Sequence, residues 1–288
     1  MMKRSEVGKR FCWTILFVFI YVFGSKIALP FVDLSRALNV NETTATGLQL
    51  SSAIMGGNLR GMSIFSIGLS PWMSSMILWR MFTVSKRFNL EKTSADIVER
   101  RKMYLTLVLA LVQALAVSMY LPLQTSLDSA LVIAVNTMIM IAGTFFLVWL
   151  SDLNAALGLG NSVVIMMAGM VMYLPEDIMR TLSKIDIPTY WYTIGLFLIL
   201  VFVFTAVLIE YARYRIPVNK LGIHNNLKSY TFLDIKLNPA GGMPFMYAMS
   251  LVSIPQYVFM LIQFMHPDNK WTSEAIKALT VGRPLWLV

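Results

Sequence analysis

The sequence predicts an all-α polytopic membrane protein, and three observations support this. Apolar residues make up 57% of the 288 positions and charged residues only 14%, against roughly 45–50% and about 25% in soluble domains. The mean hydropathy is +0.66. Several uncharged runs approach 20 residues, the length that a helix needs to cross a bilayer. The single cysteine, Cys12, excludes an intramolecular disulfide framework and a CxxC metal site.

The first half of the chain contains four long candidate spans. The first runs from residue 11 to about residue 30. Basic residues precede it, but no small-x-small cleavage site follows, so we expect an uncleaved helix rather than a signal peptide. The second, 61–79, is 19 residues without a charge, about 28 Å as a helix. A basic loop at 80–102 separates it from uncharged runs at 103–127 and 129–151.

Segment 44–57, ahead of the second span, is uncharged but rich in small and polar residues. It is too polar to face lipid and too apolar for an ordinary exposed loop. At membrane depth, such a segment is tolerated only where protein or a water-filled cavity surrounds it. We therefore predict a short plug over about 44–58, hinged by two glycines onto the second helix, with the candidate residues Leu48, Leu50, Ile54, Met55, Gly56 and Gly57.

The remaining spans are less regular. The fifth has only about 13 uncharged residues from Ser162, so it is either short and buried or continues past the charges that follow. The sixth covers 187–209, and the polar segment after it contains two short β-prone runs, 216–218 and 230–233, that could pair as a hairpin. The seventh covers 237–267 and contains three prolines. The sequence stops inside an expected eighth helix, so we expect a fragment of a longer chain.

One pattern occurs in both the second and the seventh span. Gly68-Leu-Ser-Pro-Trp-Met-Ser-Ser-Met76 and Gly241-Gly-Met-Pro-Phe-Met-Tyr-Ala-Met249 share Gly-x-x-Pro-aromatic-Met-x-x-Met. Coincidence in a methionine-rich chain is one explanation. Proline-interrupted helices in corresponding places of two halves are, however, typical of a site between structural repeats. We therefore predict a pore between these two helices.

Charge placement predicts the orientation. Sixteen of the 24 Lys and Arg lie before the first span or in segments 80–102 and 213–236, so the positive-inside rule places these segments and the N-terminus in the cytoplasm. Such basic segments can contact anionic membrane lipids, or they can dock a soluble partner.

The spans lack the groups that intramembrane chemistry needs. No carboxylate lies in the middle of a span, and there is no HExxH motif, so we expect no catalytic residue, cofactor, metal or nucleic-acid partner. Methionine is abundant instead, with 21 residues. Leu69, Met73 and Ile77 share one helix face, as do Met166 and Met170, and flexible side chains make an adaptable seal.

Five short motifs resemble the SecY family, the central subunit of the bacterial protein-conducting channel. They are Tyr21-Val-Phe-Gly-Ser25, Gly56-Gly-Asn-Leu-Arg60 with Gly68-Leu-Ser-Pro71, Gly158-Leu-Gly-Asn161, Arg215-Ile-Pro-Val218 and Asn238-Pro-Ala-Gly241. The resemblance implies ten helices in two inverted halves. Residues 1–179 would form the N-terminal half with helices one to five, and residues 180–288 an incomplete second half with helices six, seven and the start of eight.

The resemblance also implies roles for particular residues. A constriction ring would close around the translocating polypeptide, a lateral gate would lie between the second and seventh helices, and basic residues would receive a SecA-type motor ATPase. The implied ring is Leu69, Met73, Met166, Met170 and Met246. The implied gate is Pro71, Trp72, Ile77, Pro244, Phe245 and Met249, and the implied docking residues are Arg100, Arg101, Arg213 and Arg215.

Departures from the housekeeping pattern, above all a methionine-rich ring, resemble the accessory SecY proteins of streptococci and staphylococci. That resemblance implies an accessory SecA motor, small SecE- or SecG-like membrane subunits or accessory secretion proteins as partners, and serine-rich glycosylated adhesins as substrates. The alternative function from another class is an inverted-repeat secondary transporter of small molecules. The lack of charge inside the spans disfavours it.

Overall fold

The structure is a computed structural model. It describes residues 4–32, 62–84, 94–121, 128–160, 162–169, 171–172, 179, 189–217, 232–239, 241, 243–265, 271 and 274. The chain divides into two compact units, one of Met1–Pro175 with Met246–Val288 and one of Glu176–Phe245. The division into repeat halves near residue 179 stays a prediction, because compactness does not test internal repeats.

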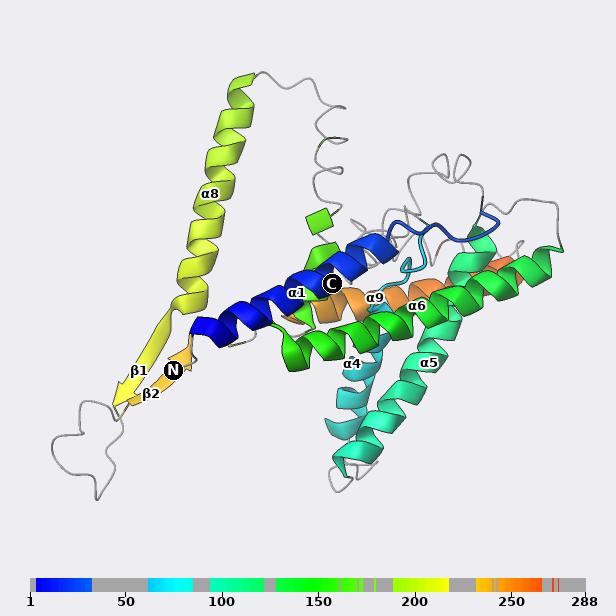
Figure 1. The fold of residues 1–288 in the computed structure, drawn as a ribbon, viewed down its shortest axis with the longest axis horizontal. Coiled ribbons are helices and arrows are strands. Elements are labelled where there is room, and N and C mark those ends of the chain that lie inside the picture. The colour runs from blue at the N-terminus through cyan, green and yellow to red at the C-terminus, as the bar shows by residue number, and fades with distance from the viewer. Residues whose placement is uncertain are drawn as a thin grey trace. The chain divides into compact units, whose positions relative to one another are not determined.

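Within the described residues, four helices are long and apolar enough to cross a membrane. They belong to α1 (Arg4–Gly24), α5 (Ala95–Tyr120), α6 (Ser129–Leu157) and α8 (Thr189–Tyr211) (Figure 1). The other two named helices are α4 (Ser70–Val84) and α9 (Met243–Met265). The structure thus confirms the predicted helical architecture.

α1 ends earlier than the sequence predicts, at Gly24 rather than near residue 30. The Ser25 hydroxyl donates a hydrogen bond to the Val22 carbonyl oxygen (2.8 Å). The chain then turns at residues 25–27, Ala28 forms an isolated β-bridge with Ser63, and the Leu29 N–H donates to the carbonyl oxygen of Met62 (2.8 Å). This pairing with a segment far along the chain competes with helix formation and ends α1.

The second predicted helix, 61–79, is wrong in its first half. Residues 62–69 are not helical, and α4 begins only at Ser70. Met62 and Gly68 have positive φ angles of 42° and 65°, which a right-handed helix does not allow. Pro71 is then the second helical residue, where its missing N–H costs nothing.

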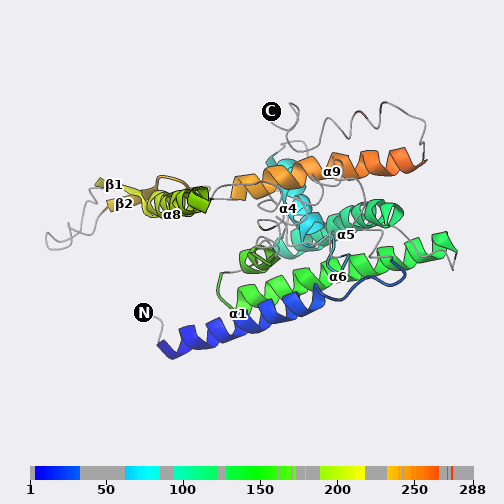
Figure 2. The same cartoon turned by 90° about the horizontal axis from the view of Figure 1, so that it is seen from above.

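α5 and α6 match the predicted third and fourth spans, and they lie side by side with α1 next to α6 (Figure 2). α5 ends at Tyr120, and Pro122 follows the extended Leu121, as expected before a proline. Its start is where the prediction fails: Arg100 and Arg101, expected in a loop, lie in the second turn of α5. With 26 residues, α5 extends to about 39 Å, longer than the hydrocarbon core, so its first turns can carry charge.

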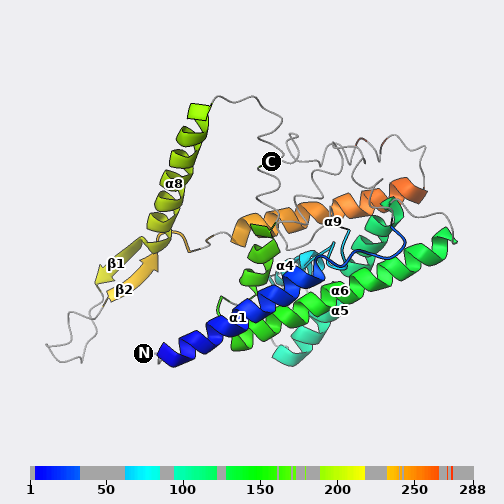
Figure 3. The ribbon, with the colours of Figure 1, turned by 45° about the horizontal axis from the view of Figure 1, so that its top comes forward.

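The second unit consists of α8 followed at once by a hairpin (Figure 3). Strand β1 (Arg213–Pro217) pairs antiparallel with β2 (Phe232–Lys236), with Ile216 opposite Leu233. The hairpin predicted from 216–218 and 230–233 is therefore confirmed, although its strands begin and end at other residues. The Leu237 N–H donates to the Ala212 carbonyl oxygen at its base (3.0 Å).

Two clusters of buried apolar side chains hold the first unit together. One joins α1, residues 65–73, α6 and residues 165–166. The other joins α5, α6 and α9 around Tyr257, together with residues 29 and 32. The first cluster contains three of the predicted pore residues.

Candidate channel constriction

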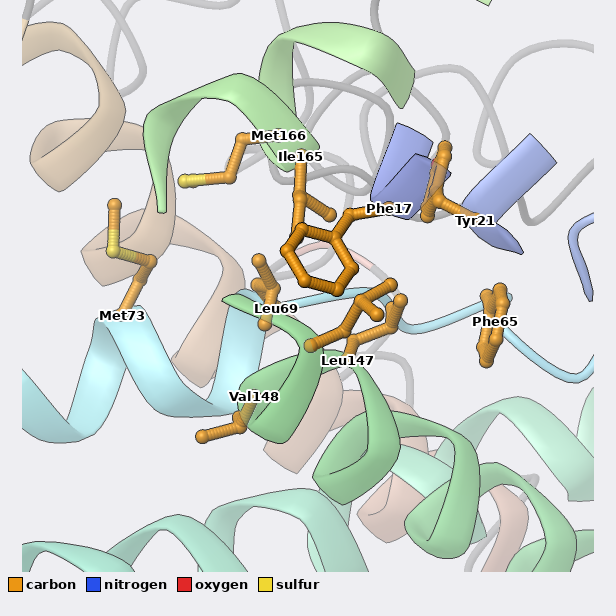
Figure 4. Close-up of a cluster of buried hydrophobic side chains, with 10 residues drawn as sticks. Phe17, Tyr21, Phe65, Leu69, Met73, Leu147, Val148, Ile165 and Met166 are labelled. Atoms are coloured by element: carbon orange, nitrogen blue, oxygen red, sulfur yellow. The ribbon is translucent and has the colours of Figure 1, made fainter. Parts of the chain in front are cut away.

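Three residues of the predicted ring lie in one buried cluster. Leu69 and Met166 are 0% exposed and Met73 is 3% exposed. Leu69 lies immediately before α4, Met73 lies in the first turn of α4, and Met166 comes from the helical segment 163–169. In Figure 4, Met73 and Met166 extend on the same side of Leu69. Residues almost 100 positions apart thus converge at one point.

Large apolar side chains from three further segments surround these residues. α1 contributes Phe17 and Tyr21, α6 contributes three residues, and Phe65 precedes α4 (Figure 4). The rings of Tyr21 and Phe65 stack with centroids 6.0 Å apart. The remaining buried members are Leu147, Val148, Leu150 and Ile165. Such a closely packed and mostly apolar environment offers few hydrogen-bonding partners to water.

The other proposed pore residues are not tested. Met170 and all plug residues, from Leu48 to Gly57, lie outside the described residues. Met246 lies in α9, but its side chain is not described. Its neighbour Tyr247 does pack against the cluster, and this brings the N-terminal end of α9 next to Leu69 and Met73. The full ring therefore stays a prediction.

The predicted gate helices, α4 and α9, meet directly. The hydroxyl groups of Ser74 and Ser250 form a buried hydrogen bond between the two helices. On α4, Pro71 and Ile77 are buried and Trp72 packs against the cluster. The remaining gate candidates on α9, whose side chains are not described, are Pro244, Phe245 and Met249.

Sequence reasoning missed these hydroxyl contacts. Ser75 of α4 also bonds to Thr106 of α5 (2.7 Å), and Thr137 of α6 donates to Ser118 of α5 (3.1 Å). Hydroxyl side chains commonly join helices inside membranes, because lipid offers them no partner. The adjacent serines in the apolar α4 sequence indicated that this helix has polar contacts, but they did not identify the partners.

The repeated Gly-x-x-Pro pattern marks the same local structure twice. Gly68 and Gly241 both have positive φ, 65° and 59°, a region that glycine enters without steric cost. In each case a helix begins two residues later, with proline as its second residue. The prediction that these prolines interrupt helices is wrong, because they start them.

The Gly-x-Gly turn after α6 serves packing. The Leu159 N–H donates to Oγ1 of Thr14 in α1 (2.8 Å). Nδ2 of Asn154 donates to the Leu159 carbonyl oxygen (3.3 Å). This turn therefore fastens the end of α6 to α1.

The four proposed docking arginines have different surroundings. Arg213 and Arg215 both form ion pairs with Asp234 across the hairpin, at 3.6 and 3.3 Å. Arg215 also lies over the ring of Phe232, 4.7 Å from its centroid. Arg100 and Arg101 are exposed, and Arg100 lines an open groove with Asp96 and Glu99.

Comparison with known sequences identifies similar proteins over nearly the whole chain. A sequence model of the SecY family matches residues 63–282. The accessory Sec system protein translocase subunit SecY2 of Streptococcus sanguinis is 51% identical over 287 residues, covering 99% of this chain and 70% of that protein. The protein of the same name from Leuconostoc gelidum is 32% identical, covering 97% and 69%.

Comparison with solved structures identifies the same fold in protein-conducting channels. A protein-conducting channel matches with a TM-score of 0.64 at 14% identity, covering 92% of this chain and 61% of the other. A structure of the SecY protein matches with a TM-score of 0.63 at 15% identity, covering 92% and 60%. The chain thus spans about 70% of the length of these relatives and about 60% of these structures.

Proposed function

This chain belongs to the SecY family of protein translocase subunits, and from that premise we propose that its buried cluster is the seal of a polypeptide-conducting pore. The channel would export unfolded proteins across the bacterial cytoplasmic membrane, with the N-terminus of this chain in the cytoplasm. Family membership favours this function over transport of small molecules.

The observation that carries the proposal is the convergence of Leu69, Met73 and Met166 in one buried apolar cluster. A narrow apolar constriction excludes water by dewetting and so blocks ions while the channel rests. Methionine suits this task because its unbranched, polarisable side chain adapts to different neighbours. In this proposal Met170 and Met246 complete the ring, and the segment 44–58 covers it as a plug.

The contact between α4 and α9 supports a lateral gate at the same place. The Ser74–Ser250 hydrogen bond is the buried contact that would break when the two helices separate. One neutral hydrogen bond contributes only about 1 kcal/mol. This hydrogen bond by itself therefore adds little to the free energy needed to open the gate.

The partners follow from the accessory Sec relatives. We propose an accessory SecA motor that docks on the basic cytoplasmic segments, and small SecE- or SecG-like membrane subunits or accessory secretion proteins beside the channel. Serine-rich glycosylated adhesins would be the exported substrates. The high identity to accessory SecY2 proteins supports this assignment over the housekeeping system.

Reconstitution tests the proposed function. Proteoliposomes that contain the channel, its small subunits and the purified accessory motor are given ATP and a serine-rich substrate with its signal sequence. We expect ATP-dependent protection of the substrate from external protease. Uptake of small solutes without protein translocation would contradict the proposal and support a transporter.

Deleting 46–57 tests the plug. We expect a larger ion leak with unchanged membrane insertion, because the outer vestibule loses its cover. Unchanged conductance in a planar bilayer would contradict the plug assignment.

A further inference from the structure

Residues 62–69 lead from the proposed plug to the proposed seal. This segment follows the plug segment 44–58 along the chain and ends at Leu69, a fully buried ring residue directly before α4. Within it, the N–H groups of Ser66 and Gly68 each donate to the carbonyl oxygen three residues earlier (both 3.0 Å). These short turns make the segment compact, so a displacement near its start passes on to Leu69.

The segment is held between α1 and α6. The ring of Phe65 stacks on Tyr21 of α1 and on Phe146 of α6, with centroids 6.0 and 5.9 Å apart. The Ile64 N–H also donates to the carbonyl oxygen of Ile27, just after α1 (3.1 Å). These contacts leave the segment little freedom to move by itself.

Two glycines make this close approach possible. A Cβ added at Gly143, inside α6, would collide with the backbone carbonyl oxygen of Ile64 and lie 2.9 Å from its Cγ2. A Cβ added at Gly24, the last residue of α1, would collide with the ring of Phe65. Neither glycine has a positive φ. Space, rather than backbone conformation, therefore requires glycine at both positions.

Gly143 is otherwise unfavourable where it lies. A glycine inside a helix is destabilising relative to alanine, because it loses more conformational freedom on folding. Alanine at 143 would therefore favour α6 and at the same time push Ile64 away. The atom in the way belongs to the backbone, so no rotation of a side chain relieves the collision. Segment 62–69 itself must shift.

We infer that Gly24 and Gly143 are positioning residues of the seal. By admitting segment 62–69 close to α1 and α6, they determine where Leu69 lies and hence how tightly the resting channel excludes ions. A shift of Leu69 opens gaps in the apolar cluster, through which water and then ions can pass. This inference rests on the proposed function, because it takes the cluster as the seal.

Gly143→Ala is the first test. The channel with its small subunits is placed in planar bilayers without the motor, and the current is divided by the amount of inserted channel. We expect the leak to rise about fivefold, the effect of roughly 1 kcal/mol on the balance between closed and open states. Gly195→Ala in α8 is the matched control, because no atom of the described residues lies within 4 Å of a Cβ added there. Its leak should be unchanged.

Gly24→Ala allows a rescue that separates positioning from general destabilisation. Its collision is with a side chain, so Phe65→Leu should relieve it, and the double variant should leak less than Gly24→Ala alone. The same Phe65→Leu change should give no relief to Gly143→Ala, whose collision is with the backbone. Such non-additivity is typical of residues in contact. A purely structural role would instead lower the thermal stability of each variant without raising the leak per inserted channel.

Three results would overturn the inference. Unchanged leak in both glycine variants, with increased leak in Met73→Asn, would leave the seal in place and show that the glycines serve packing alone. A Gly24→Ala leak that Phe65→Leu does not reduce would exclude the collision as its cause. Where Gly143→Ala does not insert, this pair of variants decides by itself. Unchanged leak in Met73→Asn as well would mean that the cluster is not the seal, and the proposed function would fail together with this inference.

Discussion

The buried cluster and the hairpin differ in how far apart in the sequence their contacting residues lie and in how exposed their side chains are. The cluster is completed by side chains from segments up to about 150 residues apart, and its ring residues are fully shielded from solvent. The hairpin is completed by local contacts, and every residue of β2 is exposed. In the proposed function, the seal therefore depends on long-range packing, whereas the docking residues Arg213 and Arg215 lie on a locally built element. Substitutions in the two regions should therefore fail in different ways.

The largest effect is expected for Met73→Asn. An unpaired amide in a buried apolar site costs about 1–3 kcal/mol, so the substitution favours a hydrated constriction. We expect roughly tenfold or greater ion leak in planar bilayers, together with a weaker requirement for a good signal sequence.

Met138→Asn is the matched control, because Met138 is 72% exposed on α6. It should lower stability without raising the leak. Met103 is unsuitable as a control because it packs against the cluster. Equal leak from the Met73 and Met138 variants would show that the cluster is not the seal.

The next largest effect is expected for the double variant Arg213→Glu and Arg215→Glu. It puts two carboxylates beside Asp234, so repulsion should loosen the hairpin. Motor affinity should fall about tenfold at low salt and less at high salt, because exposed charges are screened. Reversing Arg100 and Arg101 instead should weaken binding without affecting the hairpin. Motor affinity that is unchanged at low salt in both variants would remove the arginines from docking.

A smaller effect is expected at the contact between α4 and α9. Ser74→Ala removes one partner of the Ser74–Ser250 hydrogen bond, which should destabilise the closed gate by about 1 kcal/mol. Ser250→Ala should have the same effect, and the double variant should add little, because both remove one interaction. Additive losses would mean that the two hydroxyls act separately.

The smallest effect is expected for Thr14→Val. It removes the acceptor of the Leu159 N–H and should cost about 1 kcal/mol of stability. Thermal unfolding of the purified protein would measure the loss, while ion leak should stay unchanged. A rise in leak would show that the turn after α6 also takes part in sealing.

The sequence predicted what depends on local pattern. Apolar length revealed α5, α6 and α8. Leu69, Met73 and Ile77 are all buried, but Leu69 lies before α4 and so is not part of a helix face. The predictions failed where contacts between residues far apart in the sequence determine the structure. α1 stops at Gly24 because residues 27–29 pair with residues 62–64. α4 starts late because Met62 and Gly68 have positive φ angles and most of the residues from 63 to 69 are buried in the core.

The site was only partly predictable for the same reason. The methionines could be singled out because the resemblance named their positions. The Ser74–Ser250 and Ser75–Thr106 contacts could not, because nothing in the sequence says which hydroxyls on different helices face each other. The Asp234 contacts depend on the strand register, which the predicted hairpin did not specify.

Crosslinking to a translocating polypeptide tests the central claim most directly. In the Cys12→Ser background, Met73→Cys, Met166→Cys or Met170→Cys is combined with a cysteine in a substrate arrested during export. Met138→Cys, at an exposed position of α6, serves as the control. The account predicts disulfide crosslinks from the cluster positions and none from position 138. Crosslinks from position 138, with none from positions 73, 166 and 170, would show that the polypeptide does not pass through this cluster.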